Sequence, residues 1–251
     1  MNAASARVAA PAALSILYRD EALIVVNKPS GLLVHRGWGT DRVTAMSELR
    51  DLIGAYVYPA HRLDRSTSGA LVFVTKPELM TPVQASFEAG LVAKSYLALT
   101  RGITPEQGLI DHAIAKSKEH EKRPAQTAFR RLASFERYSL VLTRPLTGRL
   151  HQIRRHLKFI AHPIIGDTRY GKGEHNRLFR ERFALHRIAL HALQIRFQHP
   201  LREETIDVTA PLWPDLGEAL SKMGFDKALA ELLSEPLWQP DVERLPRYAD
   251  P

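Results

Sequence analysis

The segment HRLDRSTSG, residues 61–69, gathers the side chains of this chain best suited to chemistry. It places one carboxylate, Asp64, between Arg62 and Arg65, shortly before the apolar run at 70–74. That run is rich in strand-forming residues and long enough for a buried strand. A carboxylate at the mouth of such a strand, beside permanent cations, can stay ionised in a partly dry cleft and act in catalysis. A structural ion pair would have the same composition, so the segment alone leaves both interpretations open.

Segment 61–69 resembles the catalytic signature of the RluA-type pseudouridine synthases, HRLD followed by two residues and TSG. Further segments match the motifs of that family in order and spacing: KSYLAL at 94–99, TGRLHQIRRHL at 147–157, HPIIGD at 162–167 and LHA at 190–192. Together the matches span roughly residues 14–212. On this resemblance the chain is identified as a member of the family.

The resemblance implies an isomerase that converts a uridine of RNA to pseudouridine. The reaction breaks the glycosidic bond, turns the uracil and rejoins it through carbon. It needs no redox step and no outside atom, so no cofactor and no metal are expected. The catalytic carboxylate would be Asp64, either as a nucleophile or as the base for an elimination, and both routes stay open. Because a base stacked in a duplex cannot reach a pocketed carboxylate, the target nucleotide must be flipped out.

The resemblance also assigns catalytic roles to Arg154 and Tyr96. An arginine opposite a desolvated carboxylate offsets the cost of burial, because guanidinium stays charged and binds carboxylate with two donors. Arg154 lies at the edge of the apolar stripe of an expected helix, from which it could point into a cleft. The alternative is an ordinary surface arginine on an amphipathic helix. The ring of Tyr96 can stack on the target base while its hydroxyl serves proton transfer. A core tyrosine on a sheet is the alternative.

The expected substrate-binding residues are Arg62, Arg149, His151 and Gln152. Arg62 is expected to fill the space that the flipped uridine leaves in its helix. Phosphate contacts are expected from a basic surface rather than from any single residue, and its candidates lie at 116–131, 149–158 and 169–187.

The net charge of +8 is unevenly distributed along the chain. Residues 1–200 carry 30 Lys or Arg against 16 Asp or Glu, whereas residues 201–251 carry 5 against 11. This asymmetry favours a basic working surface for a polyanion such as RNA, with an acidic terminal region outside it. A solvated surface tuned for solubility is the alternative explanation.

Several other classes of protein are excluded or disfavoured. The absence of cysteine excludes disulfides, thiolate catalysis and cysteine-ligated metals. His151 and His156 are five residues apart with Gln152 between them, so the H-E-x-x-H zinc pattern fails. Only one carboxylate, Asp64, lies in the HRLD signature, whereas a glycosidase needs two opposed carboxylates. No apolar stretch is long enough for a membrane span or a secretory signal, so we expect a cytoplasmic protein, and no obligate protein partner is indicated.

Helices and strands alternate along the chain, which predicts one compact α+β unit. We expect strands at 14–18, 23–26, 70–74, 95–100, 127–135, 138–145, 190–197 and 205–209. We expect helices at 44–54, 77–90 and 214–223, and one opened by the TGR segment with the apolar stripe Leu150, Ile153, Leu157 and Ile160. Loops are expected at 116–126 and 168–182, followed by a loosely held tail after Glu235.

The resemblance completes the expected architecture. It implies the pseudouridine synthase fold, a mixed and mostly antiparallel sheet with flanking helices, split by a central basic cleft with Asp64 on its floor. We expect a flexible leader at 1–13, a catalytic domain of two packed halves at 14–225, and a C-terminal helix and tail at 226–251.

The likeness extends to one branch of the family, which modifies uridine 65 in the T stem of transfer RNA. It is carried by VNKPSGLLVHR at 26–36, the run from HPIIGD to the NR pair at 176–177, and FALHR at 183–187. We therefore expect a tRNA substrate. A relative that acts on large-subunit ribosomal RNA and a non-catalytic RNA-binding protein of the same fold are the alternatives. The second would predict a damaged HRLD segment or a missing tyrosine, and both are intact.

Overall fold

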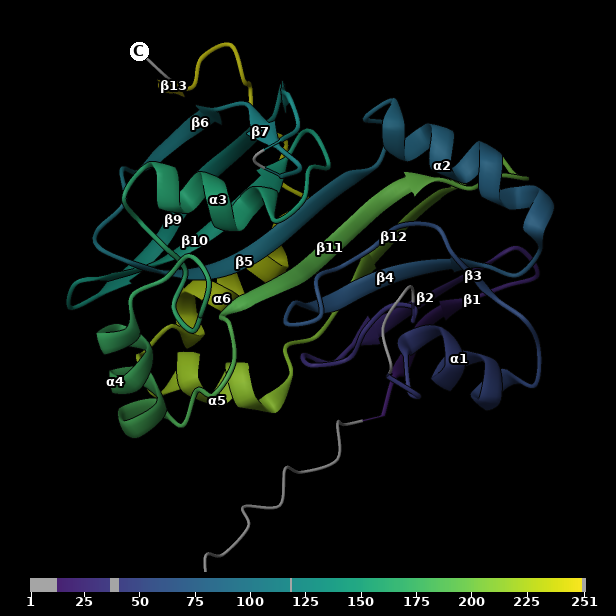
Figure 1. Ribbon diagram of the computed structural model, residues 1–251, viewed down its shortest axis with the longest axis horizontal. Coiled ribbons are helices and arrows are strands. Elements are labelled where there is room, and N and C mark those ends of the chain that lie inside the picture. The colour runs from purple at the N-terminus through teal and green to yellow at the C-terminus, as the bar shows by residue number, and fades with distance from the viewer. Residues whose placement is uncertain (1–12, 37–40, 118, 250–251) are drawn as a thin grey trace, which may run out of the picture.

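A computed structural model of the protein describes residues 13–36, 41–117 and 119–249. The expected leader at 1–13 lies outside these residues except for its last position. Figure 1 shows one long twisted sheet with helices on both of its faces. The expected α+β class with a mostly antiparallel sheet is confirmed.

In the main sheet, one strand from the last third of the chain lies between strands from the first third and strands from the middle third. In sheet order the strands are β1 (Ser15–Arg19), β2 (Leu23–Lys28), β4 (Ser68–Val74), β11 (Leu190–Gln198), β5 (Ala93–Arg101), β10 (Tyr138–Pro145), β9 (Gln126–Phe135), β6 (Gln107–Asp111) and β13 (Arg247–Ala249). Two more strands pair at the side, β3 (Tyr58–Pro59) with β4 and β12 (Thr205–Thr209) with β11. A separate small hairpin joins β7 (Ile114–Ala115) to β8 (Lys122–Arg123).

The helices flank the two halves of this sheet. They are α1 (Ala45–Ile53), α2 (Met80–Glu88), α3 (Gln152–Phe159), α4 (Gly173–Phe183), α5 (Pro214–Ser221) and α6 (Asp226–Ser234), with a 3₁₀ turn η1 at Pro77–Leu79. In Figure 1, α1 and α2 flank the half built from β1 to β4, while α3 lies in front of β9 and β10 and α6 lies behind the sheet. Helix α1 begins and ends where the sequence predicts, because Thr44 and Ser47 form a capping box and Gly54 closes the helix in a left-handed conformation.

The two halves of the sheet meet where β4 pairs with β11. The pairing is parallel and covers only two positions, Ser68 with His191 and Gly69 with Ala192. A Cβ atom on Gly69 would lie 2.2 Å from the carbonyl oxygen of Ala192, so only glycine permits this approach. Next to it, the Ser68 hydroxyl lies 2.7 Å from the Nδ1 atom of His191, and both residues are buried. The TSG and LHA motifs therefore hold the halves together.

Strand β4 supports the segment that carries Asp64. All seven residues of β4 are buried, as are all six of its neighbour β2. Burial on both faces explains why the run at 70–74 is continuously apolar rather than alternating. The loop before β4 is thus attached to one of the least exposed parts of the fold.

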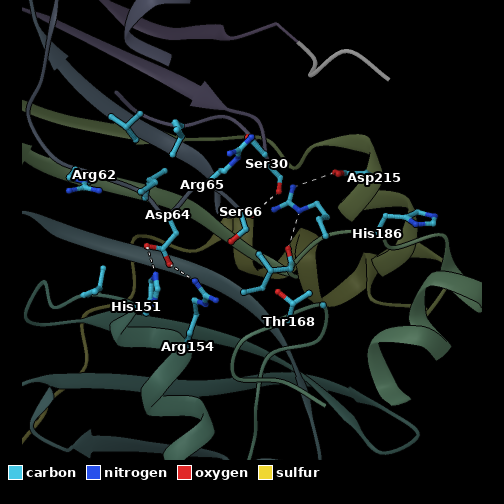
Figure 2. A pocket seen from close by; sticks show the side chains of 18 of the residues that line it. Ser30, Arg62, Asp64, Arg65, Ser66, His151, Arg154, Thr168, His186 and Asp215 are labelled. Atoms are coloured by element: carbon cyan, nitrogen blue, oxygen red, sulfur yellow. Dashed lines mark hydrogen bonds and ion pairs between the residues drawn. The ribbon is translucent and has the colours of Figure 1, made fainter. Parts of the chain in front are cut away.

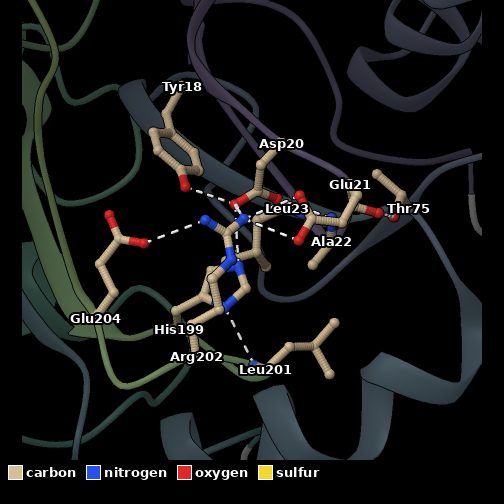
Figure 3. Close-up of polar contacts among 10 residues, drawn as sticks. All are labelled: Tyr18, Asp20, Glu21, Ala22, Leu23, Thr75, His199, Leu201, Arg202 and Glu204. Atoms are coloured by element: carbon tan, nitrogen blue, oxygen red, sulfur yellow. Dashed lines mark hydrogen bonds and ion pairs between the residues drawn. The ribbon is translucent and has the colours of Figure 1, made fainter.

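Far from this junction, a charged cluster joins the β1–β2 turn to the segment between β11 and β12 (Figure 3). The carboxylate of Asp20 accepts hydrogen bonds from the Tyr18 hydroxyl, from two backbone amides, and from the side chains of His199 and Arg202. Its hydrogen bond raises the pKa of Tyr18 to about 12. The cluster thus links the end of β1 and the start of β2 to the end of β11 and the start of β12.

Four expectations about local structure are wrong. Residues 168–182 are not simply a loop, because helix α4 occupies Gly173–Phe183. Leu150 is 47% exposed and precedes α3 rather than extending its apolar stripe. The stretch at 116–126 includes strand β8. The tail after Glu235 is held, since Leu237 and Leu245 are buried and β13 pairs with β6.

Candidate active site

Asp64 lies in the loop between β3 and β4, where two cavities meet. Figure 2 shows one of them, with the Asp64 carboxylate facing His151 and Arg154. We call them the Tyr96 cavity, of about 750 Å³, and the Arg187 cavity, of about 720 Å³. Both are lined by Arg62, Leu63, Asp64, His151 and Arg154. The side chain of Asp64 is 24% exposed, so the carboxylate is open to a ligand from either cavity.

A buried lysine holds the Asp64 loop in place. The Nζ atom of Lys28 donates hydrogen bonds to the carbonyl oxygens of Pro29, Leu32 and Arg65, at 2.8, 2.8 and 3.2 Å. These three acceptors suit the charged ammonium, although burial lowers the pKa of Lys28 to about 7. Since Arg65 directly follows Asp64, Lys28 ties the carboxylate loop to the end of β2.

Arg154 on α3 connects Asp64 to a second carboxylate, Asp167. Its Nη1 atom lies 3.0 Å from Asp64, while Nε and Nη2 donate to the two oxygens of Asp167 at 2.8 and 3.0 Å. Burial opposes the charged form of Arg154, but the hydrogen bonds and charges of the two carboxylates outweigh it and raise the pKa of the guanidinium. The Asp64–Arg154 pair agrees with the expectation from the motif resemblance, whereas the contacts of Asp167 were not expected.

The turn that carries Asp167 is itself fixed. Burial favours the neutral form of Asp167, but donors from Arg154 and from the backbone of Arg169 and Tyr170 outweigh it and lower the pKa of the carboxyl. The Asn176 side chain, on α4, accepts from the Gly166 amide at 2.8 Å and donates to the Asp167 carbonyl at 3.0 Å. A Cβ atom on Gly166 would lie 1.9 Å from the Arg187 carbonyl oxygen, which explains the glycine. Helix α4, missed in the sequence, thus positions Asp167.

His151 and Tyr170 complete the surroundings of Asp64. The Nε2 atom of His151 lies 3.8 Å from Asp64, and its Nδ1 atom lies 3.0 Å from the Tyr170 hydroxyl. The Tyr170 ring centroid is 5.1 Å from the guanidinium carbon of Arg154, within cation–π range. His151 adopts a left-handed conformation with φ 53°, a strained state for a residue with a side chain. Burial lowers the pKa of His151, and Asp64 partly opposes this effect. Sequence analysis gave no role to Tyr170.

Tyr96 lies on β5 and lines the cavity that also contains Asp64. Burial raises the pKa of its hydroxyl, and the negative charge of Asp64 acts in the same direction, so the group stays neutral. Among the described residues the hydroxyl has no hydrogen-bond partner, and it is therefore available to a bound ligand. Leu190 and Ile153 add apolar surface to the same cavity, which suits the faces of a planar base.

The expected substrate-binding residues differ in their surroundings. Arg62 is exposed at the rim shared by the two cavities. Arg149 lines the Tyr96 cavity, with its Nε atom 3.2 Å from the Pro124 carbonyl oxygen. The amide of Gln152 makes four contacts within the protein, two donated and two accepted, so any effect on a ligand would be indirect.

Within the described ranges, no helix has both the length and the apolar character required to cross a membrane. The same residues contain no group of three or more acidic or histidine side chains placed to hold a metal ion.

Comparison with known proteins decides the family. A family model described as RNA pseudouridylate synthase matches residues 22–159. The tRNA pseudouridine synthase C of Vibrio parahaemolyticus is 40% identical over 88% of this chain and all of its own length. The protein of the same name from Pasteurella multocida is 42% identical over 81% of this chain and 94% of its own. The chain belongs to the RNA pseudouridylate synthases.

Solved structures of this family agree with the fold. Human RNA Pseudouridylate Synthase Domain Containing 1 superposes with a TM-score of 0.70, at 28% identity, over 90% of this chain and 97% of its own. Human RNA Pseudouridylate Synthase Domain Containing 4 gives the same TM-score at 25% identity, over 84% and 93%. This chain is therefore an isomerase with the pseudouridine synthase fold.

The surroundings of Asp64 combine groups suited to acid–base chemistry and to binding a planar base. One carboxylate lies open to two cavities, and an arginine held by a buried anion faces it. A neutral tyrosine and apolar side chains line the side where a base can lie.

Proposed function

We propose that this protein converts a uridine of transfer RNA to pseudouridine, and that the target is uridine 65 in the T stem. The relatives that match nearly their whole length carry the name tRNA pseudouridine synthase C, which supports a tRNA substrate. The observation that carries the chemistry is the 3.0 Å contact between Asp64 and the Nη1 atom of Arg154, at the junction of the two cavities.

In the proposed reaction, Asp64 starts the chemistry at the ribose. It either adds to C1′ or removes the proton from C2′, and in both routes the C1′–N1 bond breaks with its electrons moving to the uracil. The uracil then turns, and its C5 atom bonds to C1′. In the addition route the bond between Asp64 and C1′ breaks in this step, and in the elimination route C2′ regains its proton from Asp64, so the carboxylate is restored in both. Finally C5 loses its proton and N1 gains one, so the product is an isomer of the substrate.

The neighbouring residues have distinct proposed roles in this reaction. Arg154 orients the Asp64 carboxylate through their 3.0 Å ion pair. Tyr96 stacks on the base, and its neutral hydroxyl can relay the C5 proton. Arg62, exposed at the rim, fills the gap left by the flipped nucleotide. Arg149 contacts phosphate, and His151 supports Asp64 from the other side.

The proposal can be tested by mapping pseudouridine chemically in total RNA from cells that lack this protein. We expect one mark in the T stem of tRNA to disappear and to return when the purified protein is added to that RNA. Loss of a mark in large-subunit ribosomal RNA instead would show that the substrate is wrong. An unchanged profile would contradict the activity as well.

A further inference from the structure

Lys94 lines the Tyr96 cavity and takes no part in the proposed reaction. It is on β5 two residues before Tyr96, and alternate residues of a strand face the same side. Both side chains line the cavity that contains Asp64. Alternate positions on a strand are about 6.6 Å apart, so Lys94 can reach one part of a bound nucleotide while Tyr96 contacts another.

The ammonium of Lys94 lacks an anionic partner. Lys28 has three carbonyl acceptors and Arg154 has two carboxylates. Lys94 has neither an ion pair nor a hydrogen bond among the described residues, and its Nζ atom lies 5.6 Å from the centroid of the Phe87 ring. Burial lowers the pKa of Lys94, and no ion pair or hydrogen bond from the described residues offsets that cost in the free protein. A cation in such a position fits a ligand that brings the missing negative charge.

We propose that Lys94 binds a phosphodiester group of the nucleotide being isomerised. This inference rests on the proposed function, which places a flipped uridine in the Tyr96 cavity. Uracil and ribose carry no full charge when they bind, so phosphate is the one anionic part of that nucleotide. Arg123 and Arg149 line the same cavity and add positive potential, whereas its acidic lining residues are Asp64 and Glu88. Lys94 thus anchors the backbone while Tyr96 and Asp64 act on base and sugar.

The test compares Lys94→Gln, which removes the charge, with Lys94→Arg, which keeps it. Lys227→Gln is the matched control, because Lys227 is 89% exposed on α6, away from both cavities. Binding of purified tRNA is measured at several salt concentrations. We expect Lys94→Gln to weaken binding about tenfold and to reduce the salt slope by about 0.7 to 0.9, the value for one lost phosphate contact. Lys94→Arg should keep most of the slope, and Lys227→Gln should leave binding and slope unchanged.

A second arm changes the RNA instead of the protein. The phosphates that flank the mapped target are replaced one at a time by neutral methylphosphonates. One replacement should weaken wild-type binding about tenfold and have little effect on Lys94→Gln, because the contact is already lost. Additive losses in the doubly altered complex would overturn the proposal. If Lys94→Gln proves unstable, the methylphosphonate series with wild-type protein still tests the proposal. An equal, small loss of binding at every replaced phosphate would contradict a specific contact with one of them.

These experiments distinguish an error in the phosphate assignment from an error in the proposed function. If Lys94→Gln lowers turnover while binding and salt slope stay at the wild-type values, Lys94 acts on the uracil and the phosphate assignment is wrong. If wild-type protein makes no pseudouridine in any tRNA, the proposed function fails, but the salt slopes with tRNA still decide whether Lys94 contacts phosphate.

Discussion

Asp167 accepts two hydrogen bonds from Arg154, and the remaining guanidinium edge faces Asp64. The Asp167 side chain has no exposed surface, whereas that of Asp64 is 24% exposed. The buried carboxylate therefore fixes the guanidinium, and the accessible carboxylate meets a partner whose orientation is already set. Catalytic groups act best when their supporting contacts are formed before the substrate binds.

Asp167→Asn should lower kcat by at least about tenfold while leaving RNA binding nearly unchanged. The asparagine amide loses the negative charge and presents a donor to the donors of Arg154, which frees the guanidinium to turn away from Asp64. Single-turnover rates and binding constants for the same RNA separate the two effects. Unchanged kcat would mean that Asp64 needs no fixed partner.

The same substitution gives a pH-dependent effect on stability. Since the folded protein lowers the pKa of Asp167, ionised Asp167 stabilises the fold above its unfolded pKa of about 3.9, and this contribution is lost as the pH falls from there toward the folded value. The difference in free energy of unfolding between wild type and Asp167→Asn should thus be full at pH 6 and shrink toward pH 3. Urea denaturation at several pH values measures it. A stability difference that stays constant between pH 6 and pH 3 would contradict the lowered pKa of Asp167.

Tyr170→Phe isolates one hydrogen bond in the same network. The ring over Arg154 stays, but the hydroxyl that contacts the Nδ1 atom of His151 is removed. We expect kcat to fall about fivefold, the worth of one neutral hydrogen bond, while Tyr170→Ala should lose more because the cation–π contact also disappears. Equal rates for the two variants would show that the ring contributes nothing.

The cluster in Figure 3 should affect stability without affecting catalysis. Asp20→Ala leaves the Ala22 and Leu23 amides and the His199 side chain without their acceptor, so we expect a loss of about 1–3 kcal/mol in the free energy of unfolding. Arg202→Ala should change stability little, since that side chain is 41% exposed. Chemical denaturation tests both, and a larger loss for Arg202→Ala would reverse the assignment.

Much of the fold could be predicted because local signals agreed with tertiary packing. The Thr44 cap and the Gly54 stop predict α1, and a continuous apolar run predicts a strand buried on both faces. Helix α4 was missed because its buried face is partly polar. His175 and Asn176 lie on that face and bind Tyr138 and the Gly166–Asp167 turn, so apolar periodicity cannot reveal it.

Part of the site could also be predicted, but from motif resemblance and not from local structural signals. Asp64 and Arg154 are 90 residues apart, so no local pattern pairs them, and the motif resemblance supplied the expectation. Asp167 lay in a recognised motif, but its link to Arg154 depends on the turn that α4 holds. His151 precedes α3 as its N-cap in a left-handed conformation, so Leu150 lies outside the helix. Nothing about histidine as a residue type predicts this conformation.

The most direct test of the account is the single-turnover rate of Asp64→Asn on purified tRNA, measured with RNA binding in the same buffer. Asparagine keeps the size of the side chain but can neither attack C1′ nor remove a proton from C2′. We expect no detectable pseudouridine, with a dissociation constant within about threefold of wild type, because the phosphate contacts are intact. Turnover at an appreciable fraction of the wild-type rate would contradict the claim that Asp64 performs the chemistry.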